Sequence, residues 1–452
     1  MKQVGKWIMA ATLFCGLFTL TSCVDDRDNP VDNGVSDDVI RNREEILSHV
    51  KSDAKILADN MNPEMFNLTS EVYSQLMALM TRDRNYMKNM KQILVMMAAN
   101  NALKNIKPVT KGSELAKMGY QMYIPVDIQT FGVQVVFDEN GNSRLFPCEG
   151  LEFIFPATVE GLGTTLYKVA FRTGSNWKET VAPAQLKNLK GIACVYRVPE
   201  TITMTLSGQF DDEVLTLSNS IFDIGETQIS GQSSTSLKGV GYGLPDVEST
   251  LDFYFNIVQK GTVKIDCSYV NNGLNIMTLG AMMTLPEIGK ITELLSNIEF
   301  KGISVDFDMQ ILDDLKLSGS ILDATQFSQA FMDMFKNNQN SQVSEQKFSD
   351  IIDKLSSCTK SFLSCQQAMN PLDFKLMSGE GSYANQIMPA IWSYEQMDFV
   401  PFSELMEKTD MDNVNKVINS VIPPMGTNTF LNMQVLLRIM QMLPLNSAEW
   451  GL

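Results

Sequence analysis

Histidine is almost absent from the chain, which has one, His49, among its 452 residues. A Ser-His-Asp site could therefore use only His49, and a zinc site with two or more imidazole ligands is excluded. The CxxC spacing of thiol redox catalysts and the GxSxG motif of serine hydrolases are also missing. These absences point away from the common nucleophilic and zinc-dependent enzymes.

Positive charge is scarce as well. The chain has 36 Lys and Arg against 52 Asp and Glu, which gives a formal net charge of −16. A nucleic-acid-binding protein needs a basic face that replaces phosphate counterions, so we expect no nucleic-acid partner. Hydrophobic residues make up 44% of the sequence and charged residues 19%, a composition that can build a sizeable core.

The first 22 residues have the pattern of a secretory signal peptide. Lys2 and Lys6 supply the positive start, and Trp7–Leu20 is an apolar run too short to span a bilayer. The run ends in Leu20-Thr21-Ser22-Cys23, which resembles the bacterial lipobox. That resemblance implies cleavage before Cys23 and a diacylglyceryl group on its sulfur, so Cys23 is the expected lipid-attachment site. The alternative is an ordinary cleaved signal followed by an incidental cysteine.

Residues 23–36 are acidic and contain Pro and Gly, so we expect a solvated tether. Acidic residues directly after the lipidated cysteine are similar to the surface-export signal of Bacteroides-type lipoproteins. The resemblance implies a lipid-anchored protein of the outer membrane, displayed on the cell surface, with the membrane as partner through Cys23. A periplasm-facing lipoprotein is the alternative. The resemblance ends with the tether and does not extend to the mature domain.

The period of the apolar residues changes twice along the mature chain. It is helical at first, with Ile46, Val50 and Leu57 on one side of a helix. It then becomes two, as in Val133–Phe137, which is typical of antiparallel strands with one wet face. Helical spacing returns towards the C-terminus. The order predicts an α+β fold, with an antiparallel β-sheet region flanked by N-terminal and C-terminal helical regions.

The predicted segments follow from these changes of period. They are a signal peptide (1–22), an acidic tether (23–36), an N-terminal helical region (37–108), a β-rich region (119–322) with an inserted helix (286–298), and a C-terminal helical region (325–452). Asn62-Pro63 is expected to break the first helical region, which resumes near Thr69 or Ser70. Residues 303–311 are expected to form the last strand, and Ser344–Met369 a long C-terminal helix.

Five cysteines remain after Cys15 is removed with the signal and Cys23 is lipidated. They are Cys148, Cys194, Cys267, Cys358 and Cys365. An odd number leaves at least one thiol unpaired, and the sequence does not decide whether any pair forms a disulfide. Cys358 and Cys365 are placed on the predicted helix 344–369, about 10.5 Å apart along its axis, too far apart for a disulfide. Burial as small hydrophobic residues is the favoured interpretation.

One segment approaches a metal-binding pattern. Asp138, Asn140, Asn142 and Glu149 match positions 1, 3, 5 and 12 of an EF-hand loop. Ser143, however, occupies the position at which that loop requires glycine, and the segment lies between predicted strands. A hairpin turn is therefore favoured, and we expect no metal site and no cofactor.

Methionine is unusually frequent, with 29 residues. Met side chains adapt to varied apolar partners, so some of them could line a pocket between sheet and helices, although ordinary core filling is the simpler interpretation. The residues named for such a pocket are Met96, Met97, Met282, Met283, Met309, Met332 and Met334.

The sequence favours a non-catalytic binding or interaction module. Its partner would be an apolar ligand or another protein of the cell envelope. One alternative is a carboxylate-dependent hydrolase of extracellular polysaccharide, and another is a purely structural envelope protein.

Overall fold

The computed structural model describes residues 37–422 and residue 435, except 62, 82–89, 91, 95, 97–99, 101, 128–131, 161–162, 184–190, 209–214, 226, 238–245, 260, 285–303, 313, 328, 331–344, 367 and 369. The chain divides into two compact units. Unit 1 contains residues 1–70, 226–229 and 248–430, and unit 2 contains residues 71–225, 230–247 and 431–452.

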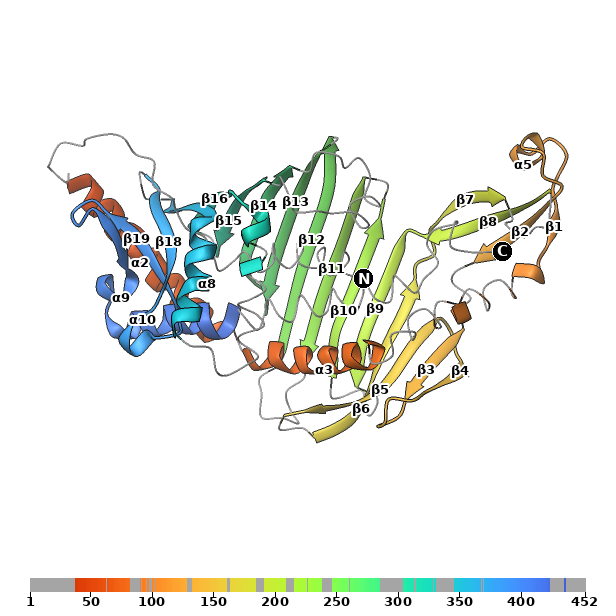
Figure 1. The fold of residues 1–452 in the computed structure, drawn as a ribbon, viewed down its shortest axis with the longest axis horizontal. Coiled ribbons are helices and arrows are strands. Elements are labelled where there is room, and N and C mark those ends of the chain that lie inside the picture. Colours follow the sequence, from red (N-terminus) through yellow and green to blue (C-terminus); the bar gives the residue numbers. More distant parts are fainter. Residues whose placement is uncertain are drawn as a thin grey trace. The chain divides into compact units, whose positions relative to one another are not determined.

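Unit 1 is built on a sheet whose strands follow one another in sequence order (Figure 1). The strands are β12 (Val247–Gln259), β13 (Thr262–Asn271), β14 (Leu274–Thr284), β15 (Ser304–Ile311), β16 (Leu315–Ile321), β17 (Thr359–Cys365), β18 (Leu372–Ser378), β19 (Ile387–Ser393) and β20 (Asp398–Pro401). Each pairs with the next in antiparallel orientation. Alternate residues of β12–β16 are buried, because successive side chains of a strand point to opposite faces and one face of this sheet is covered.

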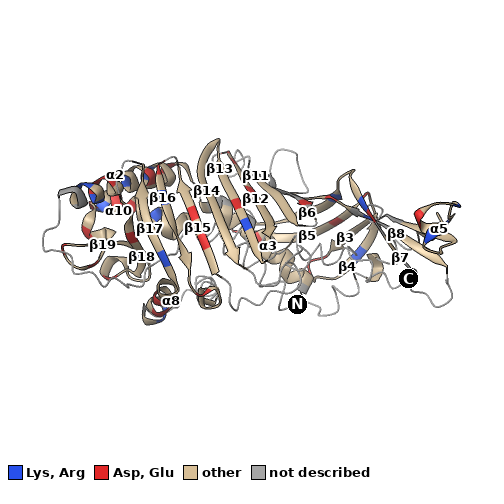
Figure 2. Cartoon of the chain, turned by 90° about the horizontal axis from the view of Figure 1, so that it is seen from above, with Lys and Arg blue, Asp and Glu red and all other residues tan. Residues whose placement is uncertain are grey.

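Helices cover both faces of strands β17 and β18. Helix α2 (Asp37–Asn60), α9 (Phe402–Leu405), α10 (Lys408–Asn415) and the π-helix η5 (Lys416–Val421) belong to unit 1, as do α8 (Glu345–Ser357) and the short 3-10 helix η4 (Gly381–Tyr383). Figure 2 shows α2 and α10 on one side of β17 and β18, and α8 on the other. The Ser356 hydroxyl at the end of α8 donates to the Leu376 carbonyl of β18 at 2.6 Å.

The break in the N-terminal helices lies where the sequence places it. Helix α2 ends at Asn60, but α3 (Pro63–Thr81) begins at Pro63 rather than near Thr69 or Ser70, so that part of the prediction is wrong. Proline fits the first helical position because an N–H at that position has no partner within a helix, so proline loses no hydrogen bond by lacking one. The buried stripe of α2 is made of Ile46, Leu47, Val50, Ala54, Leu57 and Ala58.

The C-terminal region contains more strand than predicted. Residues 303–311 are not the last strand, since β16–β20 follow, and the predicted helix 344–369 ends at Ser357. Residues 359–365 form β17 because the edge of β16 offers backbone partners from Leu315↔Cys365 to Ile321↔Thr359. The buried hydroxyls of Thr359 and Ser361 donate to the carbonyls of Leu355 and Phe374. The C-terminal segment is therefore mixed rather than helical.

Unit 2 contains the end of α3 and two groups of strands. Its elements are β1 (Lys107–Pro108), α5 (Glu114–Lys117), β2 (Met122–Asp127), β3 (Val133–Phe137), β4 (Ser143–Pro147), β5 (Leu151–Val159), β6 (Gly163–Thr173), β7 (Trp177–Pro183), β8 (Ile192–Pro199), β9 (Thr201–Gly208), β10 (Leu215–Ile224) and β11 (Gln228–Leu237), of which the first two residues belong to unit 1. The strand orders are β1-β2-β8-β7 and β11-β10-β9-β6-β5-β3-β4. The pairs β2/β8 and β3/β5 are parallel, an exception to the antiparallel prediction.

The predicted α+β class is confirmed, with a large antiparallel sheet and C-terminal helices packed against the N-terminal helix. The predicted strand 133–137 and the hairpin turn that follows it are confirmed, since β3 pairs with β4 in antiparallel orientation. The signal peptide (1–22), Cys23 in the tether (23–36) and the inserted helix (286–298) lie outside the described residues.

Candidate ligand-binding cavity

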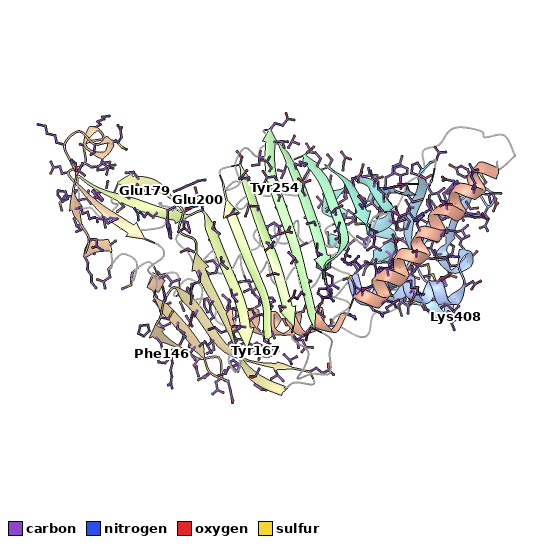
Figure 3. The ribbon with its side chains drawn as sticks, turned by 180° about the vertical axis from the view of Figure 1, so that it is seen from behind. Phe146, Tyr167, Glu179, Glu200, Tyr254 and Lys408 are labelled. Carbon is purple, nitrogen blue, oxygen red and sulfur yellow. The ribbon has the colours of Figure 1, made fainter. Side chains whose placement is uncertain are left out.

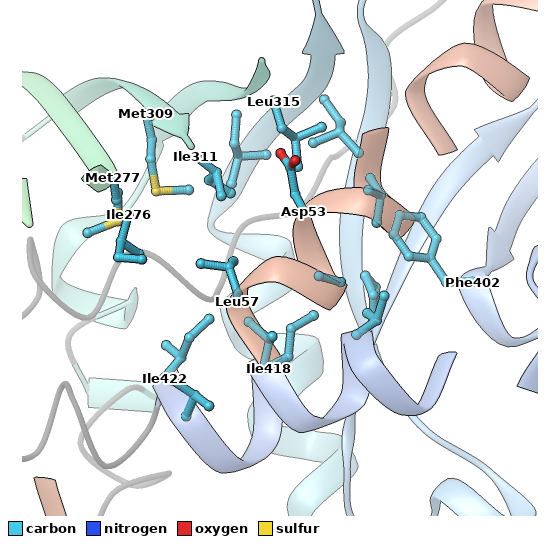
Figure 4. Close-up of a pocket in the computed structure, with 18 of the residues that line it drawn as sticks. Asp53, Leu57, Ile276, Met277, Met309, Ile311, Leu315, Phe402, Ile418 and Ile422 are labelled. Atoms are coloured by element: carbon cyan, nitrogen blue, oxygen red, sulfur yellow. The ribbon is translucent and has the colours of Figure 1, made fainter. Parts of the chain in front are cut away.

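Unit 1 contains a partly open cavity of about 130 Å³ between its sheet and the helices α2, α9, α10 and η5 (Figure 4). Twenty of its lining residues are apolar, and the other is Asp53. The apolar residues are Val50, Ala54, Leu57 and Met61 from α2 and its end, Ile276, Met277, Met309, Ile311, Leu315, Leu317, Leu363, Phe374, Leu376 and Pro389 from the sheet, and Phe402, Val414, Val417, Ile418, Val421 and Ile422 from the C-terminal helices. Such a lining disfavours water and favours an apolar occupant.

Helix α2 brings Asp53 to the cavity. Val50, Asp53 and Leu57 are spaced three and four residues apart, so they share one side of the helix. Asp53 is 7% exposed. The sequence prediction used Val50 and Leu57 but missed Asp53, although an acidic residue within an apolar helical stripe is a visible signal.

The sheet side of the cavity follows from strand register. Met277 pairs with Ile311, and Ile311 pairs with Leu315, so three adjacent strands present their side chains to the same face. Of the methionines that could line a pocket, Met309 does so. Met283 is buried in the sheet away from this cavity, which fits the favoured interpretation of core filling, whereas Met96 and Met282 are 70% and 38% exposed. Met97, Met332 and Met334 lie outside the described side chains.

The π-helix η5 forms the C-terminal wall. A π-helical turn is wider than an α-helical one and occurs frequently at functional sites. Asn419 anchors η5 to the first residue of β19, accepting from the Ile387 N–H at 2.8 Å and donating to the Ile387 carbonyl at 3.1 Å. Lys416 donates to the Ala58 carbonyl in the last turn of α2 at 2.5 Å. These bonds fix η5 against both the sheet and α2, so the wall of the cavity is preorganised.

The cysteines do not form a reactive site. All five cysteines of the described residues are thiols, four of them buried and Cys148 half-buried. The prediction that Cys358 and Cys365 share one helix is wrong, because α8 ends at Ser357 and Cys365 is the last residue of strand β17. Burial, reinforced by the negative charge of Asp323, raises the pKa of the Cys358 thiol to about 12. Burial also raises the pKa of Cys148.

We expect these thiols to react slowly in the folded protein, because the thiolate is the reactive form. At pH 7.5, the four buried cysteines of the folded protein should react with 5,5′-dithiobis(2-nitrobenzoate) about 100-fold more slowly than in urea. Cys148 should react before them, because it is only half-buried. A Cys148→Ser variant identifies the first phase. Equal labelling rates of Cys358 in the folded and unfolded protein would contradict its burial.

The EF-hand-like segment is a hairpin turn, as predicted. Asp138 accepts hydrogen bonds from the backbone N–H groups of Asn140 and Asn142 at 2.9 and 2.8 Å. Its other oxygen accepts from the Asn142 side chain at 3.0 Å. The Asn142 bonds hold the pKa of Asp138 below its usual value. The carboxylate thus serves the turn, and no cluster of three metal-ligating side chains occurs within the described residues.

His49 lies on α2 between two acidic residues. Its Nε2 is 3.7 Å from Glu45 and its Nδ1 is 3.7 Å from Asp314. Both ring nitrogens therefore face carboxylates, so neither is left to accept a proton from a serine hydroxyl as a catalytic triad requires.

The polar face of the unit 1 sheet carries acidic residues on β13 and β15, interspersed with lysines (Figure 2). Asp266 pairs with Lys264 at 2.8 Å, and Asp308 pairs with Lys316 at 2.6 Å. Asp306 accepts from the Ser320 hydroxyl at 2.7 Å. Carboxylates engaged in this way stabilise the strands, so the geometry of this face does not favour a glycoside hydrolase.

Unit 2 contains a partly buried ion pair. Glu152 on β5 is 8% exposed and is hydrogen-bonded by Arg172 of β6 and, at 2.8 Å, by Gln134 of β3. Burial opposes its negative charge, but the bonds from Gln134 and Arg172 outweigh burial, so the pKa of Glu152 lies below its usual value. The cluster ties three neighbouring strands together and has a structural role.

This pair should make unit 2 sensitive to acid. Because the pKa of Glu152 is lower in the folded than in the unfolded state, its stabilisation is present above the ordinary carboxyl pKa and is lost as pH falls through the folded value. Replacing Glu152 with Gln should cost about 1 kcal/mol at pH 7 and progressively less towards pH 3. Denaturation curves at several pH values measure this difference. Glu179→Gln is the control (Glu179 is labelled in Figure 3), because it breaks an exposed pair with Arg197 and should cost little at any pH. A pH-independent cost for Glu152→Gln would contradict the ion pair.

Comparison of the chain with protein-family models, curated proteins and solved structures gave no match. Among the described helices, none combines the length and the hydropathy needed to cross a bilayer.

Proposed function

We propose that this protein is an outer-membrane lipoprotein, displayed at the cell surface, whose unit 1 binds a small apolar ligand in the cavity beside α2. The observation that carries the binding proposal is the cavity itself, with twenty apolar lining residues and one acid. An engineered apolar cavity of about 150 Å³ in another protein binds benzene, so a volume of about 130 Å³ suits one ring or a short branched alkyl group.

The walls of the cavity support the same proposal. The π-helical turn of η5 contributes Val417, Ile418 and Val421, and Asn419 holds that turn in place from its other side. A preorganised wall lowers the entropic cost of binding a ligand. A unit whose helices only covered the sheet would gain more stability by filling this volume.

Binding is tested with 4-fluorotoluene, followed by ¹⁹F NMR during titration of the purified protein. We expect saturable binding to the wild type and a loss of affinity of about tenfold or more in Ala54→Phe, whose ring would occupy the cavity. Ile56→Phe is the matched control, because Ile56 is on the same helix but 37% exposed and should leave the affinity unchanged. Ala54→Leu replaces Ala54→Phe if the larger side chain prevents folding. Absence of saturable binding to the wild type would overturn the proposal, and native mass spectrometry of protein from its own host would identify the natural ligand.

The anchor is tested separately. Cys23→Ala, or treatment with globomycin, should release the protein from the membrane fraction or mislocalise it, whereas Cys15→Ala, within the apolar part of the signal, should not. Unchanged membrane attachment of Cys23→Ala would contradict lipidation at this residue. Antibody labelling of intact cells distinguishes surface display from a periplasm-facing anchor.

A further inference from the structure

The position of Asp53 bears on the chemical class of the ligand. Asp53 belongs to the cavity lining, and Figure 4 shows it on α2 among the apolar lining residues. Asp53 is 7% exposed, and each of the other residues around the cavity is apolar. The cavity thus has one polar position in an otherwise apolar wall.

A carboxylate at such a position discriminates strongly between ligands. When ionised it accepts hydrogen bonds and donates none. It repels a carboxylate or phosphate, and the repulsion is stronger in an apolar cavity than in water. A protonated amine, in contrast, forms a charge-assisted hydrogen bond, which is about twice as strong as a bond between neutral groups.

The net charge of the chain acts in the same direction. The formal charge of −16 attracts cations towards the protein and repels anions. A ligand with an apolar group and an ammonium group therefore matches both the apolar walls of the cavity and the negative charge of the protein.

We infer that the cavity selects an apolar amine, with the hydrocarbon group against the aliphatic walls and the ammonium group at Asp53. This inference rests on the proposed binding function. It excludes fatty acids, lipid phosphates and other apolar anions as ligands of this cavity.

The test compares three probes of similar size by ¹⁹F NMR titration: 4-fluorobenzylamine, 4-fluorotoluene and 4-fluorobenzoate. For the wild type we expect the amine to bind about tenfold more tightly than fluorotoluene, and benzoate to bind more weakly than either. In Asp53→Asn the preference for the amine over fluorotoluene should disappear. Asp59→Asn is the matched control, because Asp59 is an exposed acid on the same helix and its loss should keep the preference.

The outcomes separate this inference from the proposed function. Saturable binding of fluorotoluene with no preference for the amine in the wild type would overturn the role of Asp53 and leave apolar binding intact. If no probe binds the wild type, both are overturned. If Asp53→Asn does not fold, Asp53→Ser replaces it, and a preference for the amine over fluorotoluene that persists in that variant would overturn the role of Asp53.

Discussion

Replacing Phe402 with alanine is expected to lower the free energy of unfolding by about 3–5 kcal/mol. Phe402 begins α9, is 2% exposed and lines the cavity. Its ring lies 6.3 Å from the Phe374 ring in an edge orientation, so the substitution removes an aromatic pair and enlarges an existing void.

Urea denaturation followed by fluorescence measures this loss. Phe146→Ala is the control, because Phe146 on β4 is 45% exposed (Figure 3) and should change stability by no more than about 0.5 kcal/mol. A loss below about 1 kcal/mol for Phe402→Ala would show that α9 is not packed against the sheet as described.

The second large effect is expected at Gly319, in the middle of β16. A Cβ atom added there would lie 2.1 Å from the Lys360 carbonyl oxygen and 2.9 Å from the Ser361 Cα, both on the backbone of β17. The two strands would have to separate, so Gly319→Ala should cost about 3 kcal/mol.

Gly280 provides a matched control, since it also lies within a strand of this sheet. The nearest atom to its added Cβ is Asp266 Oδ1 at 3.8 Å, an ordinary contact distance. Gly280→Ala should be neutral or slightly stabilising, because alanine loses less backbone entropy than glycine on folding. Equal losses for the two variants, compared by urea denaturation, would rule out close approach of β16 and β17 as the cause.

The fold class could be predicted because the apolar period is clear over most of the chain. Residues 251–257 and 263–269 alternate strictly and lie in β12 and β13. The sequence predicts one helix over residues 344–369 because a helical apolar stripe continues beyond Ser357, where α8 ends, through Cys358, Phe362 and Cys365. What ends the helix is the pairing of β17 with β16 and β18, a long-range interaction that a local period does not contain.

The cavity was only partly predictable, for a similar reason. Val50, Leu57 and Met309 were correctly expected on apolar faces, since each lies on a regular period. A void, however, arises where side chains from distant segments fail to fill the space between them. Phe374, Phe402 and Val421 approach α2 only through the tertiary fold, and their spacing in the sequence does not reveal a shared wall.

The contacts between α2 and the C-terminal elements have a consequence for the order of folding during synthesis. The hydrogen bonds from Arg43 to Glu395 and from Lys416 to Ala58 join residues 352 and 358 positions apart. Strands β12–β19, in contrast, each pair with their neighbour in the chain and can assemble as they emerge. Helix α2 is therefore made before the sheet on which it packs, and its contacts with α10 and η5 form only after nearly the whole of the described chain has been made. The wall of the cavity at η5 is therefore made after all of the sheet and α2 that line the rest of it.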